Sequence, residues 1–162
     1  MSDYKNITDI LNFNPEAFAI ISGSEKYPRA YARINFYKNR DGVLVTTKAQ
    51  GLPEKQNGRG VLGFHIHSGG SCTGDNTDPF KNALTHYNPE GNLHPYHAGD
   101  MPPLFSEGGE AFSAFLTKRF KIEDIIGKTV IIHSMPDDFT TQPAGNSGEK
   151  IACGIIRKTE SR

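Results

Sequence analysis

Residues 29–47 read RAYARINFYKNRDGVLVTT, and this stretch decides the fold. In its first half small or apolar residues alternate with larger polar ones, so that one face of an extended chain is apolar. Asp41-Gly42 then forms the kind of dipeptide that joins two antiparallel strands in a tight turn, and a second apolar run begins at Val43. The stretch therefore predicts a β-hairpin with one buried face.

Similar short runs recur on both sides of this hairpin, separated by segments rich in Gly, Pro, Asn and Asp. Apolar composition or alternation predicts further strands over residues 17–21, 62–67, 111–118, 129–133 and 151–156. Only residues 122–126 indicate a helix, and it is a single turn. Many short strands without a long helix indicate an all-β sandwich or a Greek-key barrel.

The bulk properties narrow the class of protein. A chain of 162 residues is long enough for one domain with one core. The formal net charge is zero and no basic run occurs, so we expect neither nucleic acid nor a membrane as a partner. The apolar runs are far shorter than the roughly 20 residues of a membrane span. The N-terminus lacks the apolar core of a signal peptide, which predicts a cytoplasmic protein unless a leader has been removed.

Histidine is concentrated in one segment. Five of the six histidines lie between Gly63 and Asp100, and the sixth is His133. Metal-ligating side chains gathered in this way indicate a metal centre. His65 and His67 alternate with core residues of one strand, so their side chains share a face, with Cα atoms about 6 to 7 Å apart. From that spacing two imidazoles can bind one ion.

His94, His97 and Asp100 form a second set of donors, spaced three residues apart. Two imidazoles and a carboxylate suit zinc, whereas a set made only of nitrogen donors suits Cu(II). The six histidines and Asp100 offer seven donors, and two four-coordinate ions need eight, so one donor must be shared. His86 lies between the two sets and is the natural bridge. Each set alone is also compatible with exposed strand histidines or a polar loop.

Six short motifs together closely resemble the copper/zinc superoxide dismutases, in particular bacterial-type members. They are GFHIH at 63–67, HYNP at 86–89, HAGD at 97–100, IIH at 131–133, GNSG at 145–148 and ACG at 152–154. The resemblance implies an eight-stranded antiparallel Greek-key β-barrel, an immunoglobulin-like sandwich, with long metal-binding and electrostatic loops. We expect this domain to cover residues 16–158 and residues 1–15 to form an N-terminal extension.

The resemblance also implies the ligands of each ion. The copper ligands are His65, His67, His86 and His133, and the zinc ligands are His86, His94, His97 and Asp100. Asp137 matches an aspartate that links one copper histidine to one zinc histidine and fixes their rings. Cys72 and Cys153 match the family's intrachain disulfide, although cytoplasmic chains usually keep free thiols.

The implied activity is dismutation of superoxide to dioxygen and hydrogen peroxide, with copper as the redox centre. His86 is the implied proton source. Lys150 stands where the family has an arginine that receives the anion; lysine keeps the charge but lacks the forked donor. Only two residues separate His94 from His97, where better-known members have a longer connection.

The alternative function is a copper- or zinc-binding relative with little turnover, which would serve in metal delivery or buffering. Lys150 and the short connection are the features that keep this alternative open. The sequence also leaves open whether the protein forms a homodimer, because dimer contacts in this fold differ between lineages.

Overall fold

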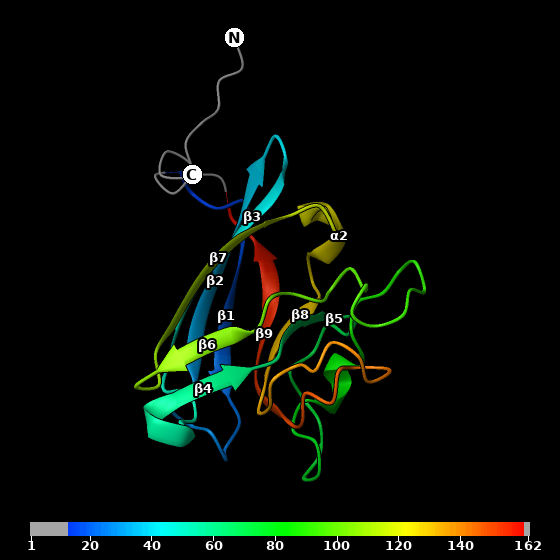
Figure 1. Ribbon diagram of the computed structural model, residues 1–162. Helices are drawn as coiled ribbons and strands as arrows, with labels where there is room; N and C mark the ends of the chain where they lie inside the picture. Colours follow the sequence, from blue (N-terminus) through cyan, green and yellow to red (C-terminus); the bar gives the residue numbers. More distant parts are fainter. Residues whose placement is uncertain (1–12, 161–162) are drawn as a thin grey trace.

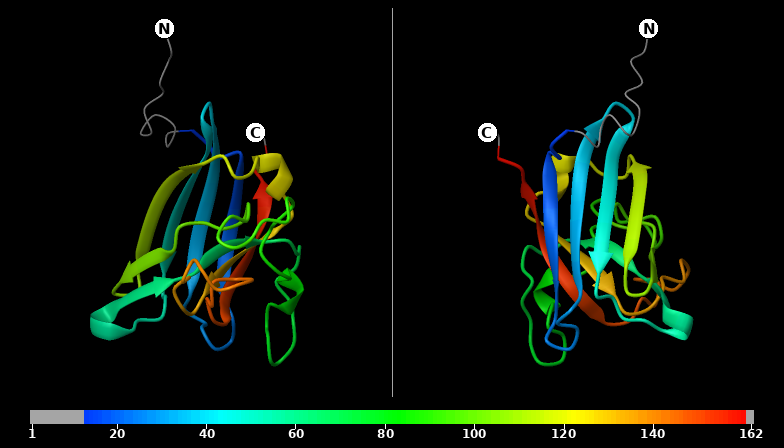
Figure 2. Two further views of the ribbon diagram at one scale, coloured as in Figure 1. Left: turned by 45° about the vertical axis from the view of Figure 1, so that its right-hand side comes forward. Right: turned by 90° about the vertical axis from the view of Figure 1, so that its left-hand side faces the viewer.

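The computed structural model describes residues 13–160 and consists almost entirely of antiparallel strands. The larger sheet has the order β5-β8-β9-β1-β2-β3-β7, and a smaller sheet pairs β4 with β6. The strands are β1 Ala17–Gly23, β2 Tyr31–Asn39, β3 Gly42–Gln50, β4 Arg59–Leu62, β5 Phe64–His67, β6 Leu104–Glu107, β7 Ala111–Thr117, β8 Thr129–His133 and β9 Lys150–Lys158. The larger sheet curls into a half-barrel, and the short β4–β6 ribbon lies over its concave side (Figures 1 and 2).

The predicted hairpin is confirmed. β2 and β3 pair in antiparallel register, and their last pair is Asn39 with Gly42, so that only two residues form the turn. Ala32 and Ile34 are buried while Tyr31 is exposed, as the alternation predicts. The pattern of the sequence is thus the pattern of one sheet face turned toward the core.

Helices are short in the described part of the chain. The single turn predicted near residue 122 is present as α2, Ile122–Ile125. Two 3₁₀ turns that the sequence did not indicate lie at Gln56–Gly58 and Lys81–Ala83. None of the helices between residues 13 and 160 has the length and apolar character needed to cross a membrane.

The strand predicted over residues 62–67 is two strands that meet at Gly63. β4 pairs with β6 in the smaller sheet, whereas β5 pairs with β8 in the larger one. The apolar alternation continues through the switch, so periodicity alone cannot reveal the change of partner. The sequence pattern indicated seven strands; this division and β6, which the sequence did not indicate, bring the number to nine in the described residues, whereas the resemblance implied eight.

The main core lies between the two sheets. Phe36 of β2 and Phe64 of β5 pack there with Leu62 and Leu104 of the smaller sheet, and all four are buried. Val130 and Ile132 of β8 belong to the same cluster. The core is therefore shared by the sheets, which explains why the ribbon stays over the half-barrel.

A second, smaller cluster lies on the other face of β8. Ile131 and Cys153 pack there against Phe80 and Ala83 from the loop that follows β5, and Cys72 packs against them. Cys72 and Cys153 form the expected disulfide, with an S–S distance of 2.03 Å. The loop is thus anchored to β9 by a covalent bond and by apolar contacts.

The predicted N-terminal extension, residues 1–15, lies mostly outside the described residues. The boundary at residue 16 stays a prediction.

Candidate metal centre

The centre is built along β5. This strand carries His65 and His67, and on one edge it pairs with β8, which ends at His133. The other edge is met by the loop between β5 and β6, through isolated bridges that join His67 to His86 and His65 to Asp100. The loop returns to the same strand twice, and each return brings a donor beside a strand histidine.

The structure brings all seven expected donors together in two groups. Within each group the candidate ligand atoms lie within 4.8 Å of one another, and the groups are His65, His67, His86 and His133, and His86, His94, His97 and Asp100. All seven residues are buried. His86 is the one member of both groups, so the geometry has the shared donor that the count of ligands required. We call these the first and the second donor group.

Hydrogen bonds in the first donor group fix which ring nitrogens are free. His67 donates from Nδ1 to the carbonyl oxygen of Leu84 at 2.9 Å, and His133 donates from Nδ1 to that of Gly148 at 3.4 Å. A neutral imidazole that donates from one nitrogen has a lone pair on the other. The two Nε2 atoms therefore face each other with lone pairs at 3.2 Å, an arrangement that a bound cation would stabilise.

Asp137 links the two groups. Its Oδ2 accepts a hydrogen bond from His65 Nε2 at 2.7 Å, and its Oδ1 accepts one from His94 Nε2 at 2.8 Å. These bonds leave His65 Nδ1 and His94 Nδ1 as acceptors, and both atoms are buried without a hydrogen-bond partner, as is His86 Nε2. Buried polar atoms normally have partners, so these three nitrogens fit metal ligation.

In the second donor group three imidazole nitrogens approach one carboxylate. Asp100 Oδ1 lies 2.8 Å from His86 Nδ1, and Asp100 Oδ2 lies 3.1 Å from His94 Nδ1 and 3.4 Å from His97 Nδ1. The backbone N–H of His97 also donates a hydrogen bond to Asp100 Oδ2 at 3.0 Å. Three imidazoles and one carboxylate are a donor set that zinc accepts in a tetrahedral site.

Burial favours the neutral form of four of the histidines. It lowers the pKa of His67 and His133 well below the ordinary 6.5, and the pKa of His65 and His97 is lowered for the same reason. Metal binding needs deprotonated imidazoles, so these shifts favour occupancy at neutral pH. Burial would raise the pKa of Asp137, but hydrogen bonds from His65 and His94 outweigh it and bring that pKa to about 2.

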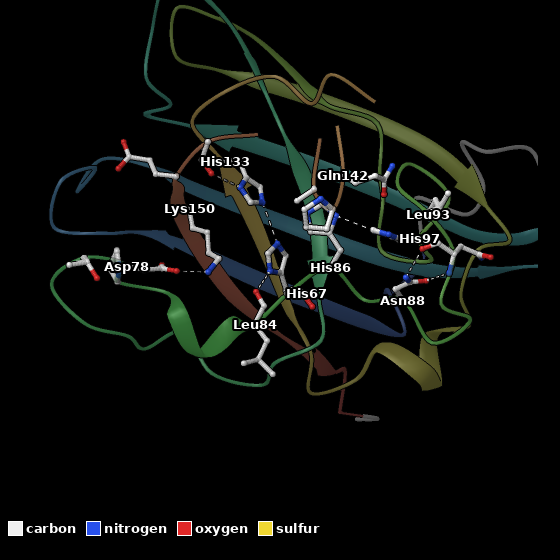
Figure 3. Close-up of a pocket in the computed structure, with 18 residues that line it drawn as sticks. His67, Asp78, Leu84, His86, Asn88, Leu93, His97, His133, Gln142 and Lys150 are labelled. Atoms are coloured by element: carbon white, nitrogen blue, oxygen red, sulfur yellow. Dashed lines mark hydrogen bonds and ion pairs between the residues drawn. The ribbon is translucent and has the colours of Figure 1, made fainter. Parts of the chain in front are cut away.

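The donor groups open onto a pocket of about 710 Å³ that is lined by His67, His86, His133 and Lys150. In Figure 3, Lys150 extends toward His67 from the start of β9. The predicted anion-binding lysine is therefore in the same pocket as the shared histidine. Its ammonium group forms an ion pair with Asp78 at 2.6 Å.

Sequence reasoning missed three residues that hold the centre in place. Asp78 binds Lys150, Gln142 binds the backbone of His94, and Arg119 donates from Nη1 to the carbonyl oxygens of Pro95 and His97, at 2.7 and 3.1 Å. Each comes from a polar loop where charged and amide side chains are ordinary, so no local pattern distinguishes them. Arg119 binds both sides of the short connection between His94 and His97.

The antiparallel half-barrel and the two adjoining groups of buried donors place this chain among β-proteins with two neighbouring metal sites. The model of the copper/zinc superoxide dismutase (SODC) family matches residues 30–156. The superoxide dismutase [Cu-Zn] 2 of Aquifex aeolicus is 36% identical over 135 residues, covering 74% of this chain and 75% of the relative. The superoxide dismutase [Cu-Zn] of Legionella pneumophila is 34% identical over 138 residues, 80% of each chain.

A solved structure agrees with the sequence relatives. The crystal structure of a double mutant of a SOD-like protein from Bacillus subtilis superposes with a TM-score of 0.69 at 28% identity, over 86% of this chain and 96% of that one. The chain belongs to the copper/zinc superoxide dismutase family. The resemblance read from the six motifs is thereby confirmed, as is the all-β fold that it implied.

Proposed function

We propose that this protein catalyses the dismutation of superoxide to dioxygen and hydrogen peroxide. The first donor group would hold copper and the second would hold zinc, because an all-imidazole set suits Cu(II) and a mixed set suits zinc. Membership of the family supports this activity, since the relatives are named copper/zinc superoxide dismutases.

The single observation that carries the proposal is the position of His86. One ring contributes to both donor groups: its Nδ1 lies 2.8 Å from Asp100, while its Nε2 is buried without a hydrogen-bond partner. A histidine between two sites couples the charge of one site to the protonation of the other. Neither group could be four-coordinate without it.

Copper, when bound, would supply one-electron redox chemistry, and zinc would supply a fixed charge without redox change. The protein's own residues position and protonate the substrate. We assign to His86 the role of proton carrier: when Nε2 is not bound to metal it would take up a proton from solvent and give it to the reduced substrate, since His86 lines the pocket where the anion enters. Asp137 keeps the His65 and His94 rings in one tautomer, so the donors stay aligned through each cycle.

Lys150 is the residue that we assign to anion binding. Its ammonium is the one Lys or Arg charge among the residues that line the pocket. It is close enough to His67 to contribute to lowering the pKa of that ring, after burial and the neighbouring His86 and His65 rings. A single point charge attracts a small anion but does not orient it as a forked guanidinium would.

The test is superoxide consumption by protein carrying one copper and one zinc, with both metals quantified on the same sample. We expect a fast rate that disappears when copper is removed. Full metal occupancy with a rate equal to that of buffer would instead support the metal-binding relative with little turnover.

The ligand assignment is tested separately by metal content. His133→Ala should weaken copper binding alone, His97→Ala should weaken zinc binding alone, and His86→Ala should weaken both. A His86→Ala protein that kept both ions with normal affinity would contradict the shared role.

Compartment and assembly stay predictions. A disulfide is more usual in oxidising compartments than in the cytoplasm, so cell fractionation would test the cytoplasmic assignment directly. Sedimentation of the loaded protein would decide between a monomer and a homodimer.

A further inference from the structure

The charges around the pocket do not favour an anion. The charged side chains that line it are Lys150, Asp78 and Glu149, one cation against two carboxylates. The whole chain adds no net attraction, because its formal charge is zero. Apart from the charge of bound metal, the attraction for superoxide must therefore come from local groups, and Lys150 is the one Lys or Arg side chain among those that line the pocket.

Asp78 holds that charge directly. Lys150 Nζ donates to Asp78 Oδ2 at 2.6 Å and to the carbonyl oxygen of Phe80 at 3.3 Å. Asp78 Oδ1 accepts the backbone N–H of Phe80 at 3.0 Å, which fixes the carboxylate. The Lys150 side chain is 15% exposed and the Asp78 side chain 36%, so solvent reaches the carboxylate more than the lysine.

Both partners are attached to the same rigid part of the fold. Phe80 is buried against Ile131 and Cys153, and Asp78 lies two residues before it. Lys150 lies three residues before Cys153, at the start of β9. The disulfide between Cys72 and Cys153 joins the loop to this strand. The contact is thus built into the scaffold and does not depend on two free side chains meeting at the surface.

The second carboxylate of the pocket is arranged differently. Glu149 accepts hydrogen bonds from Lys26 Nζ at 2.7 Å and from the Tyr27 hydroxyl at 2.5 Å. Its charge is already paired with Lys26, and no hydrogen bond or ion pair joins it to Lys150 in the described residues. Glu149 therefore offers a matched comparison: one carboxylate of the same pocket that does not hold the lysine.

We propose that Asp78 is a positioning residue that holds the Lys150 ammonium and competes with the incoming anion for it. This inference rests on the proposed function and adds to it a residue that limits anion affinity. An anion that reaches Lys150 must share the ammonium with a carboxylate already bound to it. At distances well beyond the 2.6 Å that separate the two groups, the field of the carboxylate cancels most of the field of the ammonium, so little of the Lys150 charge acts on an anion in solution.

The test compares Asp78→Asn with Glu149→Gln in protein loaded with copper and zinc. Asparagine keeps an acceptor for the Phe80 N–H, so the loop should keep its structure; metal content and melting temperature check this. Inorganic azide, a small unreactive anion, is titrated against the visible absorption of the copper. We expect Asp78→Asn to lower the dissociation constant for azide about threefold to tenfold, and Glu149→Gln to lower it less than twofold.

Kinetics give a second measurement. The superoxide rate of Asp78→Asn should rise at low ionic strength and fall more steeply with added salt than that of the unchanged protein. In a Lys150→Gln background the Asp78→Asn change should tighten azide binding no more than Glu149→Gln does.

The two proposals can fail separately. An unchanged protein that consumes no superoxide, while Asp78→Asn still tightens azide, would overturn the activity and leave the role of Asp78 intact. Equal azide constants for Asp78→Asn and Glu149→Gln would overturn the role of Asp78. The same conclusion would follow if Asp78→Asn tightened azide equally well without Lys150.

Discussion

Gln142 forms two hydrogen bonds with the backbone of one residue, His94. Its Oε1 accepts the His94 N–H at 2.9 Å, and its Nε2 donates to the His94 carbonyl oxygen at 2.7 Å. The side chain comes from the loop before β9, whereas His94 belongs to the loop before β6. A single amide thus joins two loops at a residue of the second donor group, where main-chain position decides the direction of the imidazole.

Replacing Gln142 with alanine should weaken zinc binding about tenfold to hundredfold, because it removes both bonds from the backbone that presents His94. Competition with a chelator measures the affinity. Gln142→Glu keeps the acceptor for the N–H but places a carboxylate oxygen against the carbonyl oxygen of His94, which repels it, so this variant should also lose zinc affinity. Unchanged zinc affinity in Gln142→Ala would show that the loops are held by other contacts.

Asp137→Asn should lower the affinity for both metals, again about tenfold to hundredfold. Asparagine has one carbonyl oxygen, so it can accept from His65 or from His94 but not from both. Asp138→Asn is the control: the neighbouring carboxylate binds only Thr140 and Thr141 and is exposed. Metal analysis after dialysis measures the difference, and similar losses in the two variants would contradict the link.

Gly145→Ala should prevent formation of the centre. A Cβ at this position would lie 2.0 Å from Asp137 Oδ1 and 2.6 Å from His94 Nε2, and the residue has a φ of +66°. Gly91→Ala has a similar φ of +69° with nothing within 4 Å, so it should cost only the backbone strain of about 1 to 2 kcal/mol. Metal content and thermal unfolding of both variants separate the clash from the strain.

The metal-free protein should lose stability as the pH falls below about 6.5. Burial lowers the pKa of His67 and His133 in the folded state, so below 6.5 the unfolded chain binds more protons than the folded one. The free energy of unfolding therefore decreases as the pH decreases through this range. Asp137, with its pKa of about 2, adds a further loss below pH 4. Urea unfolding between pH 8 and pH 4 measures the slope; a flat profile would contradict neutral buried histidines.

Removing the disulfide by a double Cys72→Ser and Cys153→Ser change should lower stability by up to about 4 to 5 kcal/mol. The bond closes a loop with a sequence separation of 81 residues, and the entropy lost by the unfolded chain grows with loop length. Denaturation with both metals chelated isolates this effect from metal binding. The loop that carries Asp78 should also become more sensitive to proteases, which a time course of limited digestion would show.

The sequence by itself determined most of the strands and all seven donors. Alternation in residues 29–47 is enough for the hairpin, because a period of two leaves one face of a strand to be buried. The count of seven donors for two four-coordinate ions requires a shared ligand, and the structure has His86 in both groups. Four of the six motifs that resemble the family contain donors: GFHIH, HYNP, HAGD and IIH.

Only the tertiary structure decided which residues hold those donors in place. The ion pair of Asp78 with Lys150 joins residues 72 positions apart, and the contact of Gln142 with His94 spans 48. Such contacts depend on where two loops meet after the sheet has closed, and a polar residue in a loop has no periodic neighbour to mark it. The change of pairing partner at Gly63, from β6 to β8, cannot be predicted from the sequence for a related reason. Alternation records which face of a strand is buried, whereas the strand that pairs with it is chosen by the packing of the whole chain.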